Sequence, residues 1–456
     1  MRVLFTTRSA GGRLAPLLPL ARSFVAAGHG VRVAVPPGCA EPVARAGLLA
    51  VLVGPQIAAA APRGATPVAM PGLPGVWPAN WPLHPASLTG AQHAVLRATA
   101  GARLRAAEAM APDLVSFARC WEPDLVVHDA TSYAGIVAAA VLGAPAISQL
   151  SGSAAIIRLD RHRLDGPPLP GLARLLERYG ADPAREPDLW LDPCPPSVAL
   201  PSAERRLRVR FVPPPLDTAT VARLRHMAGR YDRAPGAGPA WPRGTAPGAS
   251  RDGSPAGSRG DARTRDPGGP PGRAASGRAS DGVVRRAFVG PRVCVAWDDP
   301  AGLPEPVRSA VRQVEARGIR IIRTGSAAGP LHVLLPGCRA VLHQGNGGAA
   351  LAAALTGVPQ LIVPPRPEQR LNAAQLARVG VARVWTPPGG GTPRPPGARA
   401  PARAVQSARA ETRLIDNLFA LVEQPRYAAA AERLRGEMLA MPGPDDAVVR
   451  LASAVS

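Results

Sequence analysis

An alternation of short apolar runs with helical patterns recurs in two separate parts of the chain, and it limits the fold more than any other feature. Residues 3–5 form a short apolar run, residues 17–25 have helical spacing, and residues 31–35 form the next run. The same order returns at 123–148 and again between 292 and 363. A strand, a helix and a strand in that order build a parallel sheet with helices on its faces. The sequence therefore predicts an α/β protein with two doubly wound domains.

The stretch between these two parts has a different composition. From Pro242 to Gly282 the chain contains no bulky hydrophobic residue and consists mainly of Gly, Pro, Ser, Arg, Ala and Asp. Such a segment buries too little apolar surface to offset the entropy lost on ordering. We predict a disordered linker over residues 234–282, and an expanded surface loop at a second Pro/Gly/Arg stretch, residues 387–403.

The linker sets the expected domain boundaries. The first domain covers residues 1–233 and the second covers residues 283–415. Residues 416–456 carry apolar side chains at helical spacing. We predict that they form C-terminal helices that pack on the two domains.

The charge balance raises the question of a nucleic-acid partner. The chain has 54 basic residues, all of them Arg, against 32 acidic ones, a net charge of +22. Its 48 Gly and 55 Pro, with the absence of Lys, indicate a GC-rich coding bias. The Arg-rich linker is interspersed with Asp and has no aromatic side chains on which bases stack. We therefore expect no nucleic-acid partner.

The lengths of the apolar stretches indicate where in the cell the protein is expected. The two longest, near residues 134–148 and 348–364, contain Gly and Pro and are shorter than the roughly 20 residues that a membrane helix needs. The first residues lack the apolar run of a signal peptide. Five scattered cysteines form no metal-binding pattern. We expect a cytoplasmic protein with no membrane partner and no metal.

Three loops follow predicted strands and are candidate ligand sites, because ligands of open parallel sheets bind at the carboxyl ends of the strands. They are residues 8–13, 128–133 and 343–349. In the third, glycines allow backbone N–H groups to approach a ligand, and a helix N-terminus attracts anions. His343 can donate a hydrogen bond to a phosphate there. The alternative is an ordinary strand-to-helix turn without a ligand. No Walker A loop and no dinucleotide fingerprint is present, so we expect no cofactor.

Two acidic residues near predicted helix starts have alternative roles. Asp129, after His128 at a strand end, can orient a histidine, act as a base or cap the next helix. Glu368 and Gln369 precede a predicted helix, where an acidic side chain is favoured by the helix dipole alone. The residue patterns do not choose between these roles.

The spacing of several motifs resembles the donor-binding signature of GT-B glycosyltransferases. The motifs are residues 331–336, 343–348, 357–360, 368–369 and 372–373. The nearest resemblance is to the actinobacterial antibiotic branch, which attaches deoxysugars to macrolides and aromatic polyketides. N-terminal segments agree with it, at residues 1–5, 19–29, 113–124 and 192–197. The resemblance covers nearly all of the chain except the two low-complexity stretches.

This resemblance implies two Rossmann-like domains that face a cleft, the GT-B fold. Residues 1–233 would hold a polyketide-type acceptor, and residues 283–415 a nucleoside diphosphate sugar, expected to be a dTDP-deoxysugar. The implied reaction is inverting: a base removes the proton of the acceptor hydroxyl, which attacks the anomeric carbon. Some members of the branch need a cytochrome-P450-like auxiliary protein, so such a partner is a further candidate. The implied donor-binding residues are His343, Gly345, Asn346, Gly347, Gly348, Ala349, Glu368 and Gln369.

The sequence departs from the family pattern at the catalytic positions. Arg13 stands where the family has its histidine base, and a guanidinium cannot take up a proton. Asp129 matches the aspartate that pairs with that histidine. It either acts as the base itself or pairs with Arg13. Ala349 lacks a hydroxyl that a phosphate could use, and Asp298 and Asp299 stand where the family has Gly-Thr or Gly-Ser.

These departures leave two hypotheses. The first is an active glycosyltransferase with an altered catalytic base. The second is a catalytically impaired, glycosyltransferase-like auxiliary protein that binds a partner or a ligand.

Overall fold

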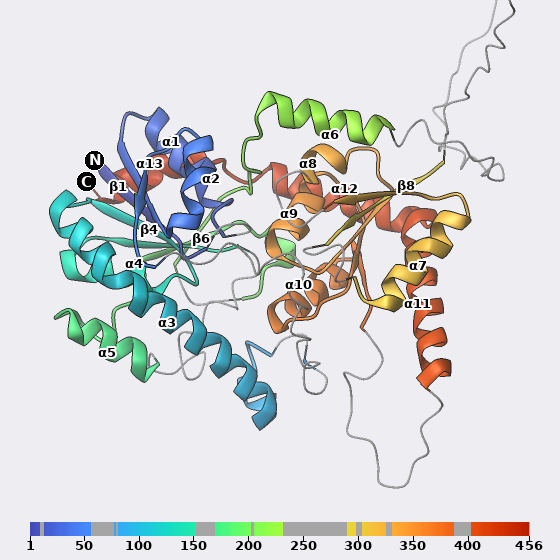
Figure 1. The fold of residues 1–456 in the computed structure, drawn as a ribbon, viewed down its shortest axis with the longest axis horizontal. Helices are drawn as coiled ribbons and strands as arrows, with labels where there is room; N and C mark the ends of the chain where they lie inside the picture. The colour runs from blue at the N-terminus through green and yellow to red at the C-terminus, as the bar shows by residue number, and fades with distance from the viewer. Residues whose placement is uncertain are drawn as a thin grey trace, which may run out of the picture.

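Two parallel β-sheets, each covered by helices, make up the part of the protein that the structure describes (Figure 1). The structure is a computed structural model, and it describes residues 1–9, 13–55, 77–78, 81–151, 169–201, 205–230, 290–297, 303–324, 331–386 and 403–455. The predicted linker at 234–282 and the predicted loop up to residue 402 lie outside these ranges. Each sheet with its helices is called a lobe below.

The first lobe is built on a seven-stranded sheet in the order β3-β2-β1-β4-β5-β6-β7. All neighbouring strands are parallel. The strands are β1 (Arg2–Thr6), β2 (Gly30–Val35), β3 (Ala50–Leu52), β4 (Leu125–Asp129), β5 (Ala146–Gln149), β6 (Leu189–Asp192) and β7 (Arg206–Arg208). The helices before β8 are α1 (Leu17–Ala26), α2 (Ala40–Arg45), α3 (Gly90–Trp121), α4 (Tyr133–Leu142), α5 (Pro170–Arg178) and α6 (Thr218–Arg230), with short 3-10 turns η1 (Pro37–Cys39), η2 (Pro85–Ser87) and η4 (Pro196–Val198).

The second lobe is built on a five-stranded parallel sheet in the order β12-β11-β10-β8-β9. Its strands are β8 (Arg292–Ala296), β9 (Arg320–Thr324), β10 (Ala340–His343), β11 (Gln360–Ile362) and β12 (Ala382–Val384). The helices that follow β8 are α7 (Glu305–Ala316), α8 (Leu331–Leu334), α9 (Gly347–Leu355), α10 (Pro367–Arg378), α11 (Arg403–Glu423), α12 (Pro425–Leu439) and α13 (Pro444–Val455).

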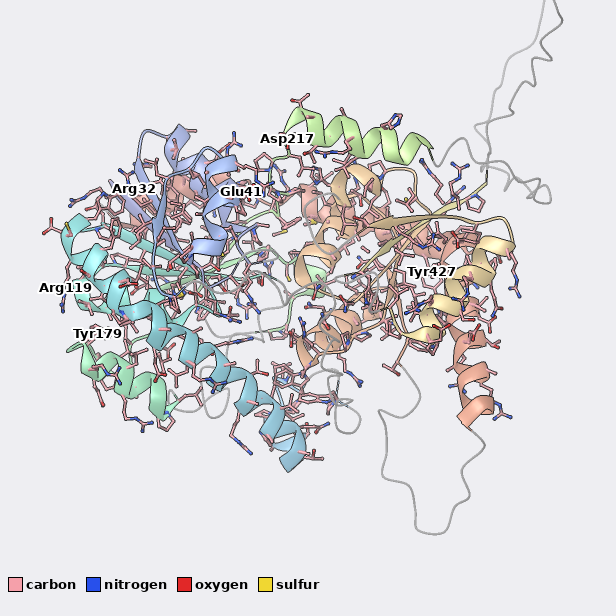
Figure 2. All side chains as sticks on the ribbon, in the orientation of Figure 1. Arg32, Glu41, Arg119, Tyr179, Asp217 and Tyr427 are labelled. Carbon is pink, nitrogen blue, oxygen red and sulfur yellow. The ribbon has the colours of Figure 1, made fainter. Side chains whose placement is uncertain are left out.

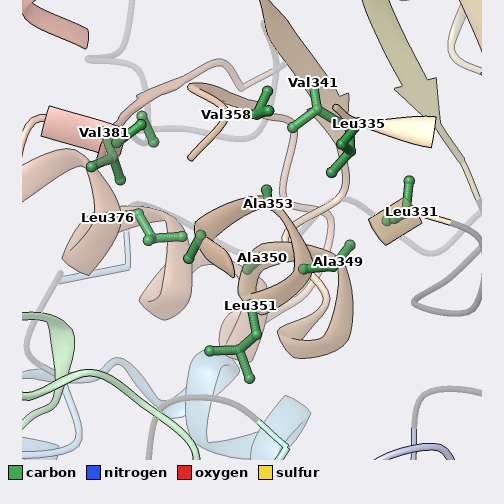
Figure 3. Close-up of a cluster of buried hydrophobic side chains, with 14 of the residues drawn as sticks. Leu331, Leu335, Val341, Ala349, Ala350, Leu351, Ala353, Val358, Leu376 and Val381 are labelled. Carbon is green, nitrogen blue, oxygen red and sulfur yellow. The ribbon is translucent and has the colours of Figure 1, made fainter. Parts of the chain in front are cut away.

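The strands near the middle of each sheet are apolar because helices cover both of their faces. Every residue of β4 and of β10 is buried. α9 is also buried along most of its length, because its small alanines let the helix lie close to its neighbours. Figure 3 shows this cluster, with Ala349, Ala350 and Ala353 of α9 facing side chains such as Val341 and Leu376.

The C-terminal helices α11, α12 and α13 pack on both lobes, and α11 crosses the predicted boundary at residue 415. The boundary at residue 415 falls inside α11, which packs on α7. α12 packs on α9. The guanidinium groups of Arg383 and Arg426 lie over the ring of Tyr427 at the start of α12; Tyr427 is labelled in Figure 2. α6, inside the predicted first domain, instead packs on α8 of the second lobe (Figure 1).

α13 returns to the first lobe and completes its core. Ala447, Val448 and Leu451 belong to the same buried cluster as Leu17 and Phe24 of α1. Both chain ends therefore lie at the first lobe, on the left in Figure 1.

Hydrogen bonds join the lobes where the chain crosses between them. The backbone N–H of Ser197, in η4, donates to Glu437 of α12 at 2.7 Å, and the N–H of Arg210 donates to the carbonyl of Pro442 at 2.7 Å. Among the described helices, none combines the length and the apolarity that a bilayer crossing requires.

Candidate functional site

Asp129 ends β4 at the carboxyl edge of the first sheet and is buried. Three hydrogen bonds hold its carboxylate. The hydroxyl of Thr7, just beyond β1, donates to Oδ2 at 2.7 Å. The backbone N–H and the hydroxyl of Thr131 donate to Oδ1 at 2.9 and 2.5 Å. The neighbouring strands β1 and β4 thus bring their loops onto one carboxylate, as the sequence predicts for loops at this edge.

The carboxylate of Asp129 is held in its ionised form. Burial by itself would raise its pKa, but the Arg13 guanidinium and the hydrogen bonds from Thr131 and Thr7 outweigh burial, and the pKa lies below its ordinary value. A carboxylate with a lowered pKa is a weak proton acceptor. This environment suits a fixed negative charge better than a general base.

Arg13 pairs with Asp129 directly. Its Nη1 lies 3.7 Å from Oδ1 of Asp129 and donates a 2.6 Å hydrogen bond to the hydroxyl of Thr131. The Arg13 side chain is 27% exposed, against 5% for Asp129. Burial lowers the pKa of Arg13, while Asp129 and, from the second lobe, Glu368 raise it. Arg13 of the first lobe and Glu368 of the second, both predicted site residues, therefore lie within electrostatic range of each other.

Two further arginines lie near Arg13. Arg8 follows β1 and belongs to the candidate loop at residues 8–13, although the sequence did not single it out. Burial lowers the pKa of Arg8, which Asp129 raises and Arg103 lowers. Arg103 lies in α3, is only 2% exposed and was not predicted. No signal in the sequence indicated it, because in an Arg-rich chain one more arginine in a helix is unremarkable.

His128 is turned away from the carboxylate of Asp129. Its Nδ1 lies 3.1 Å from the carbonyl oxygen of Asp129, and its ring packs against Gly135, where an added Cβ would lie 2.4 Å from the His128 Cβ. Burial lowers the pKa of His128, so the ring is neutral near pH 7. Asp129 therefore does not orient this histidine through its carboxylate.

The glycine turn of the second lobe follows β10 and opens α9. Gly345 has a φ of +88°, and a Cβ there would lie 2.8 Å from Cγ2 of Ile362. The backbone N–H of Gly345 donates to Nδ1 of His343 at 2.9 Å, and Nε2 of His343 lies 2.9 Å from Oε1 of Gln360. Both ring nitrogens of His343 are thus used inside the protein. The ring therefore shapes the turn, and donation from His343 to a phosphate stays a prediction that would require Nε2 to leave Gln360.

Side chains of α10 hold the same turn in place. The amide of Gln369 donates to Oδ1 of Asn346 and accepts the N–H of Arg366 at 3.0 Å. Asn372 donates to the carbonyl of Gly345 at 3.0 Å. Glu368, beside Gln369, is half-buried. Gln369 therefore supports the turn.

The beginning of α9 carries the backbone N–H groups that no helical carbonyl can satisfy. Asn346 is the N-cap residue, and its side chain makes no capping bond to the helix. Gly347, Gly348 and the buried Ala349 form the first turn. N–H groups without a helical carbonyl partner and the helix dipole favour an anion at this end.

A small, partly open apolar recess adjoins this turn between the lobes. It is lined by Cys194, Pro195 and Val198 from the first lobe, by Gly347 of α9, and by Leu434 of α12 among others. The glycine turn therefore lies where the lobes meet.

Other residues considered from the sequence lie away from the site or outside the described ranges. Asp298 and Asp299 are among the residues that the structure does not describe. Within the described ranges, no three His, Cys, Asp or Glu side chains are grouped as metal ligands would be.

Comparison with known proteins now identifies the group to which this arrangement belongs. Two family models described as erythromycin biosynthesis protein CIII-like match the chain, the N-terminal domain over residues 22–215 and the C-terminal domain over residues 302–394. The TDP-daunosamine transferase DnrS of Streptomyces peucetius is 30% identical over 99% of this chain and 96% of its own. The chain belongs to this family of antibiotic-biosynthesis glycosyltransferases.

Further relatives and solved structures agree. The 10-deoxymethynolide desosaminyltransferase of Streptomyces venezuelae is 29% identical over 99% of this chain and 96% of its own. The glycosyltransferase VinC in complex with dTDP is 25% identical, with a TM-score of 0.63 over 100% of this chain and 99% of VinC. The rhamnosyltransferase SpnG with thymidine diphosphate, 21% identical with a TM-score of 0.64 over 99% and 100% of the two chains, shares the fold. The predicted GT-B fold is confirmed, and the reaction class of this family member is glycosyl transfer.

Proposed function

We propose that this glycosyltransferase moves a deoxysugar from a thymidine diphosphate sugar to an oxygen of a polyketide-type natural product, with inversion at the anomeric carbon. The observation that carries the proposal is that Arg13 of the first lobe lies within electrostatic range of Glu368 of the second, the residue next to Gln369, which holds the glycine turn. The printed names of relatives that transfer daunosamine and desosamine support this substrate class.

The donor diphosphate would lie on the first turn of α9. The N–H groups of Gly347, Gly348 and Ala349 supply donors, and the helix dipole favours the negative charge. Ala349 has no hydroxyl, so one possible hydrogen bond to the phosphate, a contribution of roughly 0.5–1.5 kcal/mol, is absent. Glu368 is the acidic side chain next to this turn and would accept from sugar hydroxyls.

The transfer step is a displacement at the anomeric carbon. The acceptor oxygen forms the new bond on the face opposite the diphosphate. The bond between the anomeric carbon and the diphosphate oxygen breaks, and the nucleoside diphosphate leaves with the electron pair. Arg13 and Asp129 lie on the acceptor side of this step. The lowered pKa of Asp129 makes the carboxylate a poor base for an alcohol.

Calorimetric titration of the purified chain with thymidine diphosphate, uridine diphosphate and thymidine tests the donor site. We expect the diphosphates to bind and thymidine to bind far more weakly, because the helix terminus binds the diphosphate. The absence of affinity for any nucleoside diphosphate would overturn the proposal.

The P450-like auxiliary protein stays a prediction. Turnover by the purified chain alone, with thymidine diphosphate sugars and phenolic or alcoholic acceptors, would remove the need for it. Restoration of turnover only on adding a P450-like protein would support it.

The replacement of the family's histidine by Arg13 favours a second candidate function, an impaired auxiliary protein that binds a ligand or a partner. This candidate predicts that the natural chain binds thymidine diphosphate but transfers sugar to no acceptor, and that Arg13→His gains transfer. Turnover by the natural chain would exclude it.

A further inference from the structure

Three arginines, Arg8, Arg13 and Arg103, lie within electrostatic range of one another at the edge of the first sheet, and Arg13 pairs with Asp129. Arg13 is bonded to Thr131 and lies 3.7 Å from Asp129. Arg8 and Arg103 lie close enough that each lowers the pKa of Arg13, whereas Asp129 raises it. Among the described residues, Asp129 is the acidic side chain of the first lobe that compensates these guanidinium groups.

The two inner arginines have donors that no described residue accepts. Nε of Arg8, and Nε and Nη1 of Arg103, are buried without a hydrogen-bond partner in the described part of the chain. Arg103 as a whole is 2% exposed. Burying a charge without a partner is costly, and the cost is offset when an anion supplies both the charge and the acceptors. An oxyanion could accept from these buried guanidinium donors, because charge-assisted hydrogen bonds to an anion are the strong ones.

We propose that the acceptor binds in this cluster as an oxyanion, an ionised phenol or enol or a carboxylate, and that this oxygen is the nucleophile. The inference rests on the proposed function and names the acceptor class of the same site. This inference explains how a transferase can have Arg13 at the position where the family resemblance implies a histidine base. An oxyanion already lacks the proton that a base would remove.

The chemical balance of the step needs no further reactant. The negative oxygen forms its bond to the anomeric carbon, and the diphosphate takes the electron pair of the bond that breaks. The charge passes from the acceptor to the leaving group. No proton is moved during the step.

The donor diphosphate is the other anion at this interface, and its place differs. It is assigned to the first turn of α9 in the second lobe, whereas Arg8 follows β1 and Arg103 lies in α3 of the first lobe. A substitution of Arg8 or Arg103 therefore distinguishes binding of the acceptor oxyanion from binding of the donor diphosphate.

Three small aromatic probes test the class of acceptor, in the presence of saturating thymidine diphosphate. They are 7-hydroxy-4-methylcoumarin (a phenol), 2-naphthoate (a carboxylate) and 2-naphthalenemethanol (a neutral alcohol). We expect the first two to bind and the alcohol to bind at least about 10-fold more weakly. The fluorescence titration of the bound coumarin should show its hydroxyl pKa lowered by about one unit or more. Equal binding of the alcohol, an unshifted coumarin pKa, or no binding of any probe would overturn the proposal.

Arginine variants locate the effect. Arg8→Gln and Arg103→Gln should each weaken the binding of 2-naphthoate about 10-fold and reverse part of the coumarin shift. Arg22→Gln removes the same charge from the exposed face of α1 and should change neither.

Thymidine diphosphate affinity serves as the test of folding. If thymidine diphosphate fails to bind the natural chain, the proposed function fails. If it binds the natural chain but loses affinity in Arg8→Gln with the fold intact by circular dichroism, the cluster holds the diphosphate and this inference fails.

Discussion

Arg13 and Asp129 form an ion pair across the edge of the first sheet, with 3.7 Å between Nη1 and Oδ1. The hydroxyl of Thr131 joins the two, because it accepts from Arg13 and donates to Asp129. At the two positions where the family resemblance implies a histidine and an aspartate, this chain has a cation and an anion that hold each other. The pair fixes charge in the site and leaves proton transfer without an obvious agent.

Replacing Asp129 by Asn distinguishes a base from a positioning residue. The variant keeps the hydrogen-bond acceptor but loses the charge that holds Arg13. We expect transfer to a phenolic acceptor to fall about 10-fold, less than the 10²–10⁴-fold that general-base catalysis contributes, with thymidine diphosphate affinity unchanged. Steady-state kinetics and calorimetry measure both. A loss of about 10³-fold or more at unchanged acceptor affinity would restore Asp129 as the base.

Arg13→His should change which acceptors react. A neutral imidazole takes up a proton, whereas the guanidinium does not. We expect transfer to neutral alcohols to appear in the variant and to rise with pH as an imidazole near its ordinary pKa of about 6.5 loses its proton. Phenol binding should weaken, since one cation of the cluster is lost. Rates with paired phenol and alcohol acceptors across pH measure this, and an unchanged acceptor preference would contradict it.

Gly345→Ala should damage both stability and donor binding. The left-handed conformation costs an alanine roughly 1–2 kcal/mol, and its Cβ would lie 2.8 Å from Ile362 Cγ2 and 3.1 Å from the Gln369 carbonyl oxygen. Chemical denaturation and calorimetry with thymidine diphosphate give the two readouts. Gly436→Ala is the matched control: this exposed glycine of α12 has open space around its Cβ position, and the change should stabilise by roughly 0.5–1 kcal/mol.

His128 should make the fold sensitive to mild acid. Burial holds its pKa in the folded state below 6.5. The unfolded chain therefore binds a proton that the folded chain does not, and stability is lost as pH falls through that unfolded value. His128→Asn should flatten the decline in unfolding free energy between about pH 7 and about pH 5. His84→Asn, at an exposed position, should leave the slope as in the natural chain.

Sequence patterns predicted the βαβ units well because continuous buried runs mark their strands. α4 lies inside the unit predicted at residues 123–148, and β10, α9 and β11 follow in the predicted order. α3 was not predicted, because its buried face mixes small alanines with the polar Gln92 and Arg103, and because it contains Pro112. The formation of such a helix depends on its packing against residues that are distant in sequence.

The candidate site divides in the same way. Its loops could be placed, since parallel strands put their carboxyl ends along one edge. The hydrogen-bond partners of the site residues could not be predicted. Whether His343 faces a ligand or Gln360, for example, depends on the register of β10 against β11. The cluster of Arg8 with Arg103 requires α3 to pack beside the end of β1.

The return of α13 bears on how this enzyme can be divided and recombined. Its apolar side covers α1, so the lobe that begins the polypeptide is finished only by the polypeptide's last helix. A fragment cut before Pro444 would expose the leucines of α1 to water. A hybrid that exchanges acceptor lobes between two such transferases must carry α13 together with the N-terminal portion, and so needs two junctions in the gene.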